Sequence, residues 1–339
     1  MHAPHIVSYT LLVLPPLLLT IYFLAAFPHP PPPLMVHPSL ASLPNTSRSW
    51  DIYPEDYYPG GEYITLPYGR MRYWLFGPDN GKKIVLIHGL SVPAIIWKDV
   101  APQLSKRGYR VLVYDLYGRG YSDAPQTTYD ARLYATQLAL LMQHIKWERA
   151  HVAGISMGGA IAAAFVSHFP DLVSDRVVLI ASAGLMEPAD ISRTSKVMSS
   201  PLVQMIASSS LVRTFIQHLA DRSDTAADVA QKSPWADIVR IQSAHLPYFN
   251  TAVASSLRDG PIRGLAHSFA SPSFAGRRVL VIHGTRDTTV PYKYAGKIMS
   301  LLPKTAEAEL ITVEGGSHDL TSTHSDLVFN AISEFIDRR

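Results

Sequence analysis

HVAGISMGGA, residues 151–160, is the most informative segment of the sequence. It holds Ser156 between Gly154 and Gly158, the G-x-S-x-G spacing that places a serine on a sharp turn between a strand and a helix. At average glycine and serine usage, chance supplies such a match in about one chain in ten of this length. The match therefore carries weight only if a strand precedes it, a helix follows it, and an acid and a histidine come later in the chain.

The neighbouring residues supply the strand and the helix. RAHVAGI (149–155) predicts a strand, and MGGAIAAAFVSHF (157–169) predicts a helix. Glycines at 154, 158 and 159 allow a sharp turn that a Cβ atom would obstruct. Such a turn lifts the Ser156 hydroxyl above the sheet and aims the Met157 amide at the same point. We predict Ser156 as a nucleophile and the Met157 amide as one donor of an oxyanion hole.

A serine nucleophile needs a base, and the base needs an orienting carboxylate. His318 lies in VEGGSHDL (313–320), directly after the last predicted strand, where two glycines give the loop latitude. Asp287 follows the preceding predicted strand in VIHGTRDTTVP (281–291). We predict His318 as the base and Asp287 as the acid. Asp319 is expected to cap the last helix, because side chains adjacent in sequence diverge.

The second oxyanion donor is expected in LIHGLSVPAIIW (86–97). There the Leu90 amide is the natural partner of the Met157 amide, and Gly89 permits a close backbone approach. His88 is expected to brace this loop, and His283 to be a packed histidine at a strand end. Asp115 and Asp123 follow a different strand and are interpreted as turn residues.

Eight runs predict strands, and most are continuous β-branched and leucine segments typical of parallel strands buried on both faces. The first two form a hairpin with a short turn. The eight runs are EYITLPY, MRYWLFG, KKIVLIHG, YRVLVYD, RAHVAGIS, DRVVLIAS, RRVLVIHG and AELITVE. Helical periodicity fills the intervals. We therefore predict an α/β fold with a mostly parallel eight-stranded sheet flanked by helices.

One interval, residues 187–274, lacks a convincing strand and holds amphipathic stretches such as residues 200–222. We interpret it as an inserted helical cap, with residues 59–186 and 275–339 forming the two parts of the core. Some apolar side chains of the cap should face a substrate cavity.

The N-terminal residues 1–30 predict a membrane segment, because Ile6 to Phe27 carries no charged side chain and is long enough for one crossing. Pro15 and Pro16 would kink a helix, so a re-entrant hairpin is an alternative, as is a cleaved secretory signal. Residues 31–58 are interpreted as a Pro-rich extended linker. The expected location is a membrane, the endoplasmic reticulum or a lipid droplet, with secretion as the alternative.

Composition excludes several classes of function. The formal net charge is only +3 and the basic residues are scattered, so nucleic-acid binding has no support. The chain contains no cysteine, which excludes disulfides, thiolate catalysis and cysteine-based zinc sites. No H-E-x-x-H motif is present, and we expect neither a metal nor a cofactor.

From about residue 60 the chain resembles proteins of the α/β-hydrolase fold, on the motifs HGLS, YDLYGRGYSD, GISMGG, HGTRDTTVP and GGSHDL in the order Ser, Asp, His. The resemblance implies a serine hydrolase that cleaves carboxylic esters through an acyl-enzyme, without a cofactor. The S-M-G-G form, the cap and the N-terminal segment resemble membrane-associated monoacylglycerol lipases, which implies a small lipid-like ester as substrate. A carbon–carbon bond hydrolase, a small peptidase, an amidase and a non-enzymatic ligand-binding protein are the alternatives.

Overall fold

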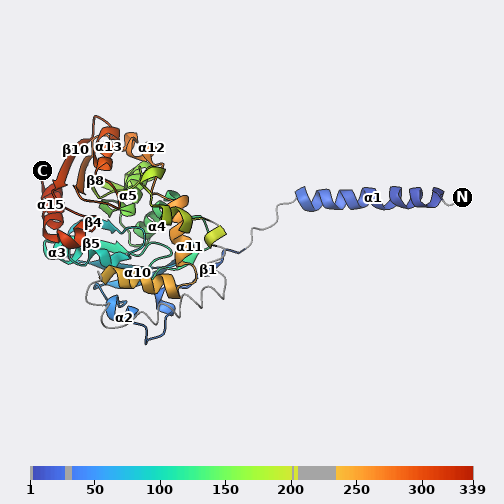
Figure 1. The fold of residues 1–339 in the computed structure, drawn as a ribbon, viewed down its shortest axis with the longest axis horizontal. Coiled ribbons are helices and arrows are strands. Elements are labelled where there is room, and N and C mark those ends of the chain that lie inside the picture. The colour runs from blue at the N-terminus through green and yellow to red at the C-terminus, as the bar shows by residue number, and fades with distance from the viewer. Residues whose placement is uncertain (1–2, 27–32, 201, 205–233, 339) are drawn as a thin grey trace. The chain divides into compact units, whose positions relative to one another are not determined.

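A computed structural model describes residues 3–26, 33–200, 202–204 and 234–338. The chain forms two compact units, Met1–Leu34 and Met35–Arg339. The second unit contains the sheet and every predicted site residue (Figure 1).

The sheet has eight strands in the order β10-β9-β8-β7-β4-β5-β3-β2. Strand β3 runs in the direction opposite to the other seven strands of this sheet. It pairs antiparallel with β2 and β5, and all other pairs in the sheet are parallel. This confirms the predicted mostly parallel sheet and its first hairpin. The strands are β2 (Gly61–Leu66), β3 (Gly69–Phe76), β4 (Lys82–Ile87), β5 (Tyr109–Tyr114), β7 (Ala150–Ile155), β8 (Val173–Ile180), β9 (Arg278–Gly284) and β10 (Glu307–Val313).

Helices cover both faces of the sheet, which explains why its central strands are apolar throughout (Figure 1). Along β5, Leu112 and Tyr114 pack into one core cluster and Val111 and Val113 into the other. The first cluster includes side chains of α4 (Ala131–His144), α5 (Met157–His168) and α13 (Lys293–Leu301). The second includes side chains of α3 (Ala101–Lys106) and α15 (Ser325–Asp337).

Between β8 and β9 the described residues form a series of helices joined by loops and include no strand, as predicted for a helical insertion. Most of the stretch 200–222 lies outside the described residues. The described helices are η4 (Pro188–Asp190), α6 (Arg193–Met198), α10 (Pro234–His245), α11 (Phe249–Arg258), α12 (Ala266–Phe269) and η5 (Pro272–Phe274). Helices α10 and α11 reach residues on the C-terminal side of β4 and β5, where the site lies.

Residues 35–58 differ from the extended linker that the prolines predicted. Strand β1 (Val36–His37) pairs antiparallel with β6 (Ala124–Pro125), and η1 (Leu40–Ser42) and α2 (Ser49–Ile52) follow it. Leu40, Tyr53 and Tyr58 are buried in the core. These large side chains bury enough apolar surface to hold an irregular segment in place, but irregular structure has no periodicity by which the sequence could reveal it.

Asp115 ties this segment to the sheet. Its buried carboxylate accepts hydrogen bonds from the Ala94 amide at 2.8 Å, the Tyr121 amide at 2.8 Å and the Tyr53 hydroxyl at 3.0 Å. Burial raises the pKa of Asp115 to about 7, although the three hydrogen bonds favour its charged form. Asp115 is therefore a structural turn residue, as its sequence position suggested.

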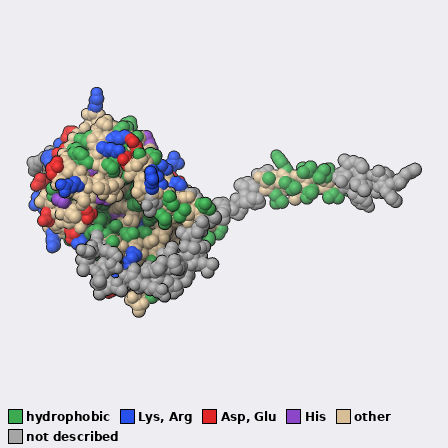
Figure 2. Space-filling model, in the orientation of Figure 1, with side chains coloured by type: hydrophobic (Ala, Val, Ile, Leu, Met, Phe, Trp, Pro, Cys, Tyr) green, Lys and Arg blue, Asp and Glu red, His purple; other side chains and the backbone are tan. Residues whose placement is uncertain are grey.

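The first unit contains α1 (Ala3–Ala26), one helix that runs through Pro15 and Pro16. The re-entrant hairpin considered from the sequence is not what the structure adopts. Between Leu12 and Leu24 its large apolar side chains are exposed, and no charged atoms appear on its described part (Figure 2). In the part of the chain that the structure describes, no helix combines the length and apolar character needed to cross a membrane, so the span predicted within residues 1–30 is not found there.

Candidate active site

Ser156 occupies a strained turn between β7 and α5. Its backbone has φ 57° and ψ −122°, a conformation that non-glycine residues rarely adopt. Two backbone hydrogen bonds join it to β8 and the loop after β8: the Ser156 amide donates to the Ile180 carbonyl at 2.8 Å, and the Ala183 amide donates to the Ser156 carbonyl at 3.0 Å. The neighbouring strand β8 and the loop after it therefore fix the direction of the Ser156 side chain.

The glycines around Ser156 are required by close packing. A Cβ atom on Gly154 would lie 2.1 Å from the Gly158 carbonyl oxygen, and one on Gly158 would lie 2.2 Å from the Ile87 carbonyl oxygen. A Cβ atom on Gly159 would lie 2.5 Å from the Ser182 hydroxyl. The first turn of α5 thus packs directly on the ends of β7 and β4, with no space for a side chain, as the sequence predicted.

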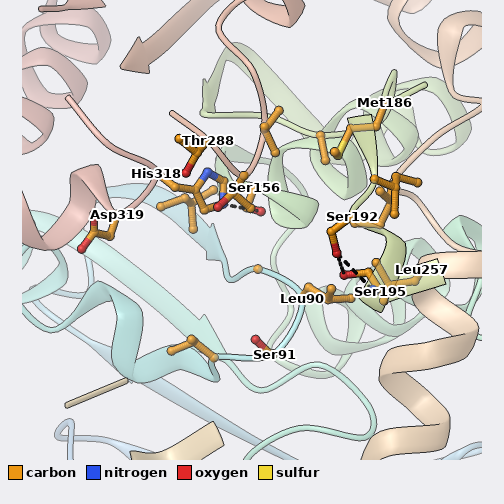
Figure 3. A pocket seen from close by; sticks show the side chains of 18 of the residues that line it. Leu90, Ser91, Ser156, Met186, Ser192, Ser195, Leu257, Thr288, His318 and Asp319 are labelled. Atoms are coloured by element: carbon orange, nitrogen blue, oxygen red, sulfur yellow. Dashed lines mark hydrogen bonds between the residues drawn. The ribbon is translucent and has the colours of Figure 1, made fainter. Parts of the chain in front are cut away.

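The structure brings Ser156, His318 and Asp287 into one hydrogen-bonded line. His318 Nε2 lies 2.9 Å from Ser156 Oγ, and His318 Nδ1 lies 2.7 Å from Asp287 Oδ2. Asp287 follows β9 and His318 follows β10, so both come from loops at the C-terminal edge of the sheet, where β7 presents Ser156. Figure 3 shows the imidazole of His318 directed at the Ser156 hydroxyl. This geometry allows His318 to take the serine proton.

Asp287 is held in its charged form. Its Oδ1 accepts from the Thr289 and Val290 amides, each at 2.8 Å, and its Oδ2 faces His318. Burial favours the neutral acid, but hydrogen bonds from His283, His318 and Val290 outweigh it and hold the pKa of Asp287 well below its ordinary value. The ionised carboxylate stabilises a positive charge on His318 and fixes its tautomer.

His283 contributes more than its position at a strand end suggested. It is fully buried, and its Nε2 lies 2.8 Å from the Val290 carbonyl oxygen and 3.4 Å from Asp287 Oδ2. Its ring therefore supports the loop that carries Asp287. His283 and Asp287 are four positions apart in sequence, but only the tight turn after β9 brings the two side chains together.

Asp319 differs from its predicted role. It occupies the N-terminal boundary of α14 (Leu320–Thr323), yet its side chain makes no capping hydrogen bond. It accepts a hydrogen bond from the Ser317 hydroxyl at 2.5 Å, and it lines the cavity beside Ser156. The expected single final helix is divided into α14 and α15.

The loop at residues 88–91, which carries the predicted Leu90 donor, packs against Ser156 through Gly89. The Leu116 amide donates to His88 Nε2 at 2.9 Å, so the proton of this imidazole is on Nδ1, which donates to the Gly89 carbonyl at 2.9 Å. Burial lowers the pKa of His88 to about 3, and the ring stays neutral. The Gly89 carbonyl and the Leu90 N–H belong to one planar peptide and point in opposite directions. By holding the carbonyl, His88 therefore fixes the direction of the Leu90 N–H.

Met157 is the first residue of α5, so its N–H has no acceptor within the helix. Gly89 packs closely on Ser156, since a Cβ atom on Gly89 would lie 3.3 Å from the Ser156 Cβ. The 88–91 loop and the start of α5 are thus adjacent at the serine, which is the arrangement that a two-amide oxyanion hole requires.

A cavity of about 460 Å³ opens beside Ser156 and His318. Figure 3 shows Ser192, Ser195 and Leu257 from the inserted region across the cavity from the Ser156–His318 pair. Besides Ser156, the residues with hydroxyl groups that line the cavity are Ser91, Ser192, Ser195, Thr288 and Thr289. Its apolar lining includes Ile96, Met186, Ile191, Trp235, Leu257 and Ile262. Among the described residues that line it, none is lysine or arginine.

Comparison with known proteins matches residues 84–331 to a family model described as the Alpha/beta hydrolase family. The chain belongs to the alpha/beta hydrolase family. An uncharacterized protein of Mycobacterium tuberculosis is 35% identical over 112 residues, which span about a third of each chain, 33% of this one and 32% of the relative. The 2-hydroxy-6-oxo-2,4-heptadienoate hydrolase of Pseudomonas putida is 26% identical over 231 residues, 66% of this chain and 78% of that enzyme.

Solved structures of alpha/beta hydrolases share the fold. A hydrolase from Pseudomonas aeruginosa superposes with a TM-score of 0.64 at 20% identity, covering 82% of this chain and 98% of that one. A thermophilic esterase from Thermogutta terrifontis gives a TM-score of 0.62 at 20% identity, covering 81% of this chain and 97% of that one. At this identity the similarity establishes the architecture alone.

The packing of the serine turn predicts that Gly154→Ala lowers the free energy of unfolding by more than about 3 kcal/mol, because its methyl group meets backbone atoms that cannot move independently. Gly296→Ala is the control, since a Cβ atom there meets nothing within 4 Å and the residue lies inside α13. We expect that variant to be more stable than the native chain by up to about 1 kcal/mol. Denaturant titrations measure both, and equal effects of the two variants would contradict this account.

Replacement of the buried carboxylate by Asp287→Asn should lower kcat by about 10⁴-fold, since the neutral amide no longer supports a cationic His318. The folded-state pKa of Asp287 lies below its unfolded value, so its stabilising contribution is present above about pH 4 and is lost as the pH falls through the folded value. The Tm difference between the native chain and this variant should therefore shrink from pH 7 to pH 3. Asp79→Asn, at an exposed carboxylate paired with Arg110, is the control and should leave kcat unchanged.

Proposed function

We propose that this alpha/beta hydrolase is a serine carboxylic-ester hydrolase that acts on small, uncharged, lipid-like esters of the monoacylglycerol type. The observation that carries the proposal is the line of hydrogen bonds from Ser156 to His318 to Asp287, which opens into an apolar cavity bordered by hydroxyl groups.

The reaction follows from the geometry. Ser156 Oγ attacks the ester carbonyl carbon while His318 Nε2 takes the hydroxyl proton, and the carbonyl electron pair moves onto the oxygen, which the Leu90 and Met157 amides bind. The tetrahedral species expels the alcohol, which leaves with the proton from His318. Water then attacks the acyl-enzyme and passes a proton to His318. The second tetrahedral species collapses as His318 returns this proton to Ser156 Oγ, which releases the carboxylic acid and regenerates the free serine.

The cavity favours a neutral ester with an apolar acyl group. Met186, Leu257 and Ile262 offer apolar surface to the acyl chain, whereas the hydroxyls of Ser91, Ser192 and Ser195 suit an alcohol part that carries its own hydroxyl groups. The only charged side chains in the described lining other than a protonated His318 are the carboxylates Asp190 and Asp319. Asp190 is paired with Lys293 at 2.7 Å, but a carboxylate substrate, such as the one named for the Pseudomonas putida relative, would still meet the carboxylate of Asp319.

The proposal predicts that hydrolysis of medium-chain monoacylglycerols and of p-nitrophenyl butyrate exceeds that of matched esters carrying a carboxylate on the acyl chain by at least about tenfold in kcat/KM. Ser156→Ala should abolish it, and a fluorophosphonate should label the native chain but not this variant. The same screen includes peptide, amide and vinylogous diketone substrates. Faster turnover of any of these than of all esters would overturn the ester assignment, and a native chain that is not labelled would point to a non-enzymatic protein.

We further propose that α1 attaches the protein to a lipid surface, as expected from the charge-free N-terminus. Helix α1 exposes apolar side chains from Leu12 to Leu24, and such a surface is unfavourable in water. A membrane location would bring the cavity to lipid-like esters and agrees with the predicted localisation at the endoplasmic reticulum or a lipid droplet.

Flotation with neutral phosphatidylcholine vesicles tests this attachment. The native chain should float, and Leu18→Lys combined with Leu24→Lys should reduce the floating fraction at least about fivefold, because each lysine adds a charge to the apolar helix. Leu327→Lys, at an exposed leucine of α15, is the matched control and should float like the native chain. Equal flotation of all three would exclude α1 as the attachment.

A further inference from the structure

Arg119 is a fully buried arginine that takes no direct part in the reaction described above. It lies in the loop between β5 and β6, and its exposed fraction is 0%. Its hydrogen-bond acceptors are all carbonyl or hydroxyl oxygens. Within the described residues, no carboxylate forms an ion pair with it. Burial of a guanidinium without an opposite charge is costly, so its full set of hydrogen bonds points to a specific task.

One of these bonds holds the 88–91 loop. Arg119 Nε donates to the Leu90 carbonyl oxygen at 2.8 Å. His88 holds the preceding carbonyl, that of Gly89. The two carbonyls on either side of the Leu90 Cα are therefore both fixed by buried side chains. This double restraint fixes the orientation of the peptide that carries the Leu90 N–H.

The other end of the same guanidinium holds the inserted region. Arg119 Nη2 donates to the Ser256 hydroxyl at 2.8 Å, and this hydroxyl also contacts Tyr134 at 2.8 Å. Ser256 belongs to α11, and the next residue, Leu257, lines the cavity. A single side chain thus joins the wall of the cavity to the peptide that carries the proposed oxyanion donor.

Helix α10 makes a parallel connection. The buried Gln242 accepts from the Gly120 amide at 2.7 Å through Oε1, and its Nε2 donates to the Ser91 carbonyl at 3.3 Å. Helices α10 and α11 are therefore each hydrogen-bonded to the 88–91 loop or to the loop of Arg119. Polar networks of this kind rigidify their surroundings when every member is satisfied.

We propose that Arg119 is a positioning residue that holds the oxyanion hole in place by linking it to the inserted helices. Its Nε holds the Leu90 peptide, and its Nη2 holds α11. The inference rests on the proposed function, because it assigns a use to the Leu90 amide in that reaction. Removing Arg119 should leave substrate binding in the cavity nearly intact and weaken the stabilisation of the tetrahedral oxyanion.

The variant Arg119→Met keeps the apolar length of the side chain and removes all its donors. We expect kcat on p-nitrophenyl butyrate to fall about 10–100-fold, a loss no greater than that caused by removing an oxyanion donor itself. The KM should change less than about twofold. In an alkyl trifluoromethyl ketone, Ser156 Oγ bonds to the carbonyl carbon, the Ser156 proton passes to His318, and the carbonyl oxygen becomes an oxyanion. Its affinity should fall by the same factor as kcat, whereas a merely structural defect would not tie these two quantities together.

Arg176→Met is the matched control. Arg176 is also a buried arginine that donates to carbonyl oxygens, those of Phe335 and Arg338, but it lies near the start of β8, at the opposite end of the sheet from Ser156. We expect it to lower Tm and to leave kcat and ketone affinity unchanged. Loss of kcat in Arg176→Met equal to that in Arg119→Met would overturn the specific role of Arg119.

Ser256→Ala provides a second, milder test that applies even where Arg119→Met fails to fold. It removes the α11 end of the connection, and we expect a threefold to tenfold loss of kcat. In the Arg119→Met background the same substitution should add almost nothing, because the two residues act through one connection. Native kcat in Ser256→Ala, or full additivity in the double variant, would overturn the inference.

Measurements on the native chain distinguish a failure of the proposed ester-hydrolase function from a failure of the proposed role of Arg119. If it neither hydrolyses esters nor reacts with a fluorophosphonate, the proposed function fails and this inference fails with it. If it hydrolyses esters and Arg119→Met retains native kcat and ketone affinity, the ester-hydrolase function stands and only the role of Arg119 is refuted.

Discussion

The constraint on which the site depends is the contact between the first turn of α5 and the ends of β7 and β4. Gly154 and Gly158 leave no room for a methyl group, so backbone meets backbone. This close packing forces Ser156 into a positive φ and projects its hydroxyl from the sheet edge. Hydrogen bonds between Ser156 and β8 or the loop after it maintain this strained conformation. These hydrogen bonds persist because the core on both faces of the sheet is tightly packed.

The parallel sheet converts distance in sequence into proximity in space. Ser156, Asp287 and His318 each follow a different strand, and parallel strands end at one edge. A single-residue shift in any of the three loops would break a hydrogen bond of 2.7–2.9 Å. The glycines after β10 give the His318 loop its freedom, and the paired amides of Thr289 and Val290 fix the Asp287 carboxylate.

Buried polar groups, together with apolar packing, join the peripheral segments to this centre. Asp115 binds the irregular residues 35–58 to the sheet. Within the 88–91 loop, the imidazole of His88 holds the Gly89 carbonyl, and Arg119 holds the Leu90 carbonyl from outside the loop. Each group is costly to bury, and each is satisfied by several oriented partners. Such groups define one arrangement of a loop, whereas apolar packing alone tolerates several.

The sequence by itself determined the order of strands and helices, the serine turn and the three side chains now hydrogen-bonded in line, because strand periodicity and glycine spacing are local signals. It did not predict the packing of residues 35–58, the division of the last helix, the contact of His283 with Asp287, or the partners of Arg119. Those features arise from contacts between residues such as Tyr53 and Asp115, or Arg119 and Ser256, that lie 62 and 137 positions apart. Only the tertiary structure decides them, because the energy of a buried hydrogen bond depends on which groups packing brings within reach.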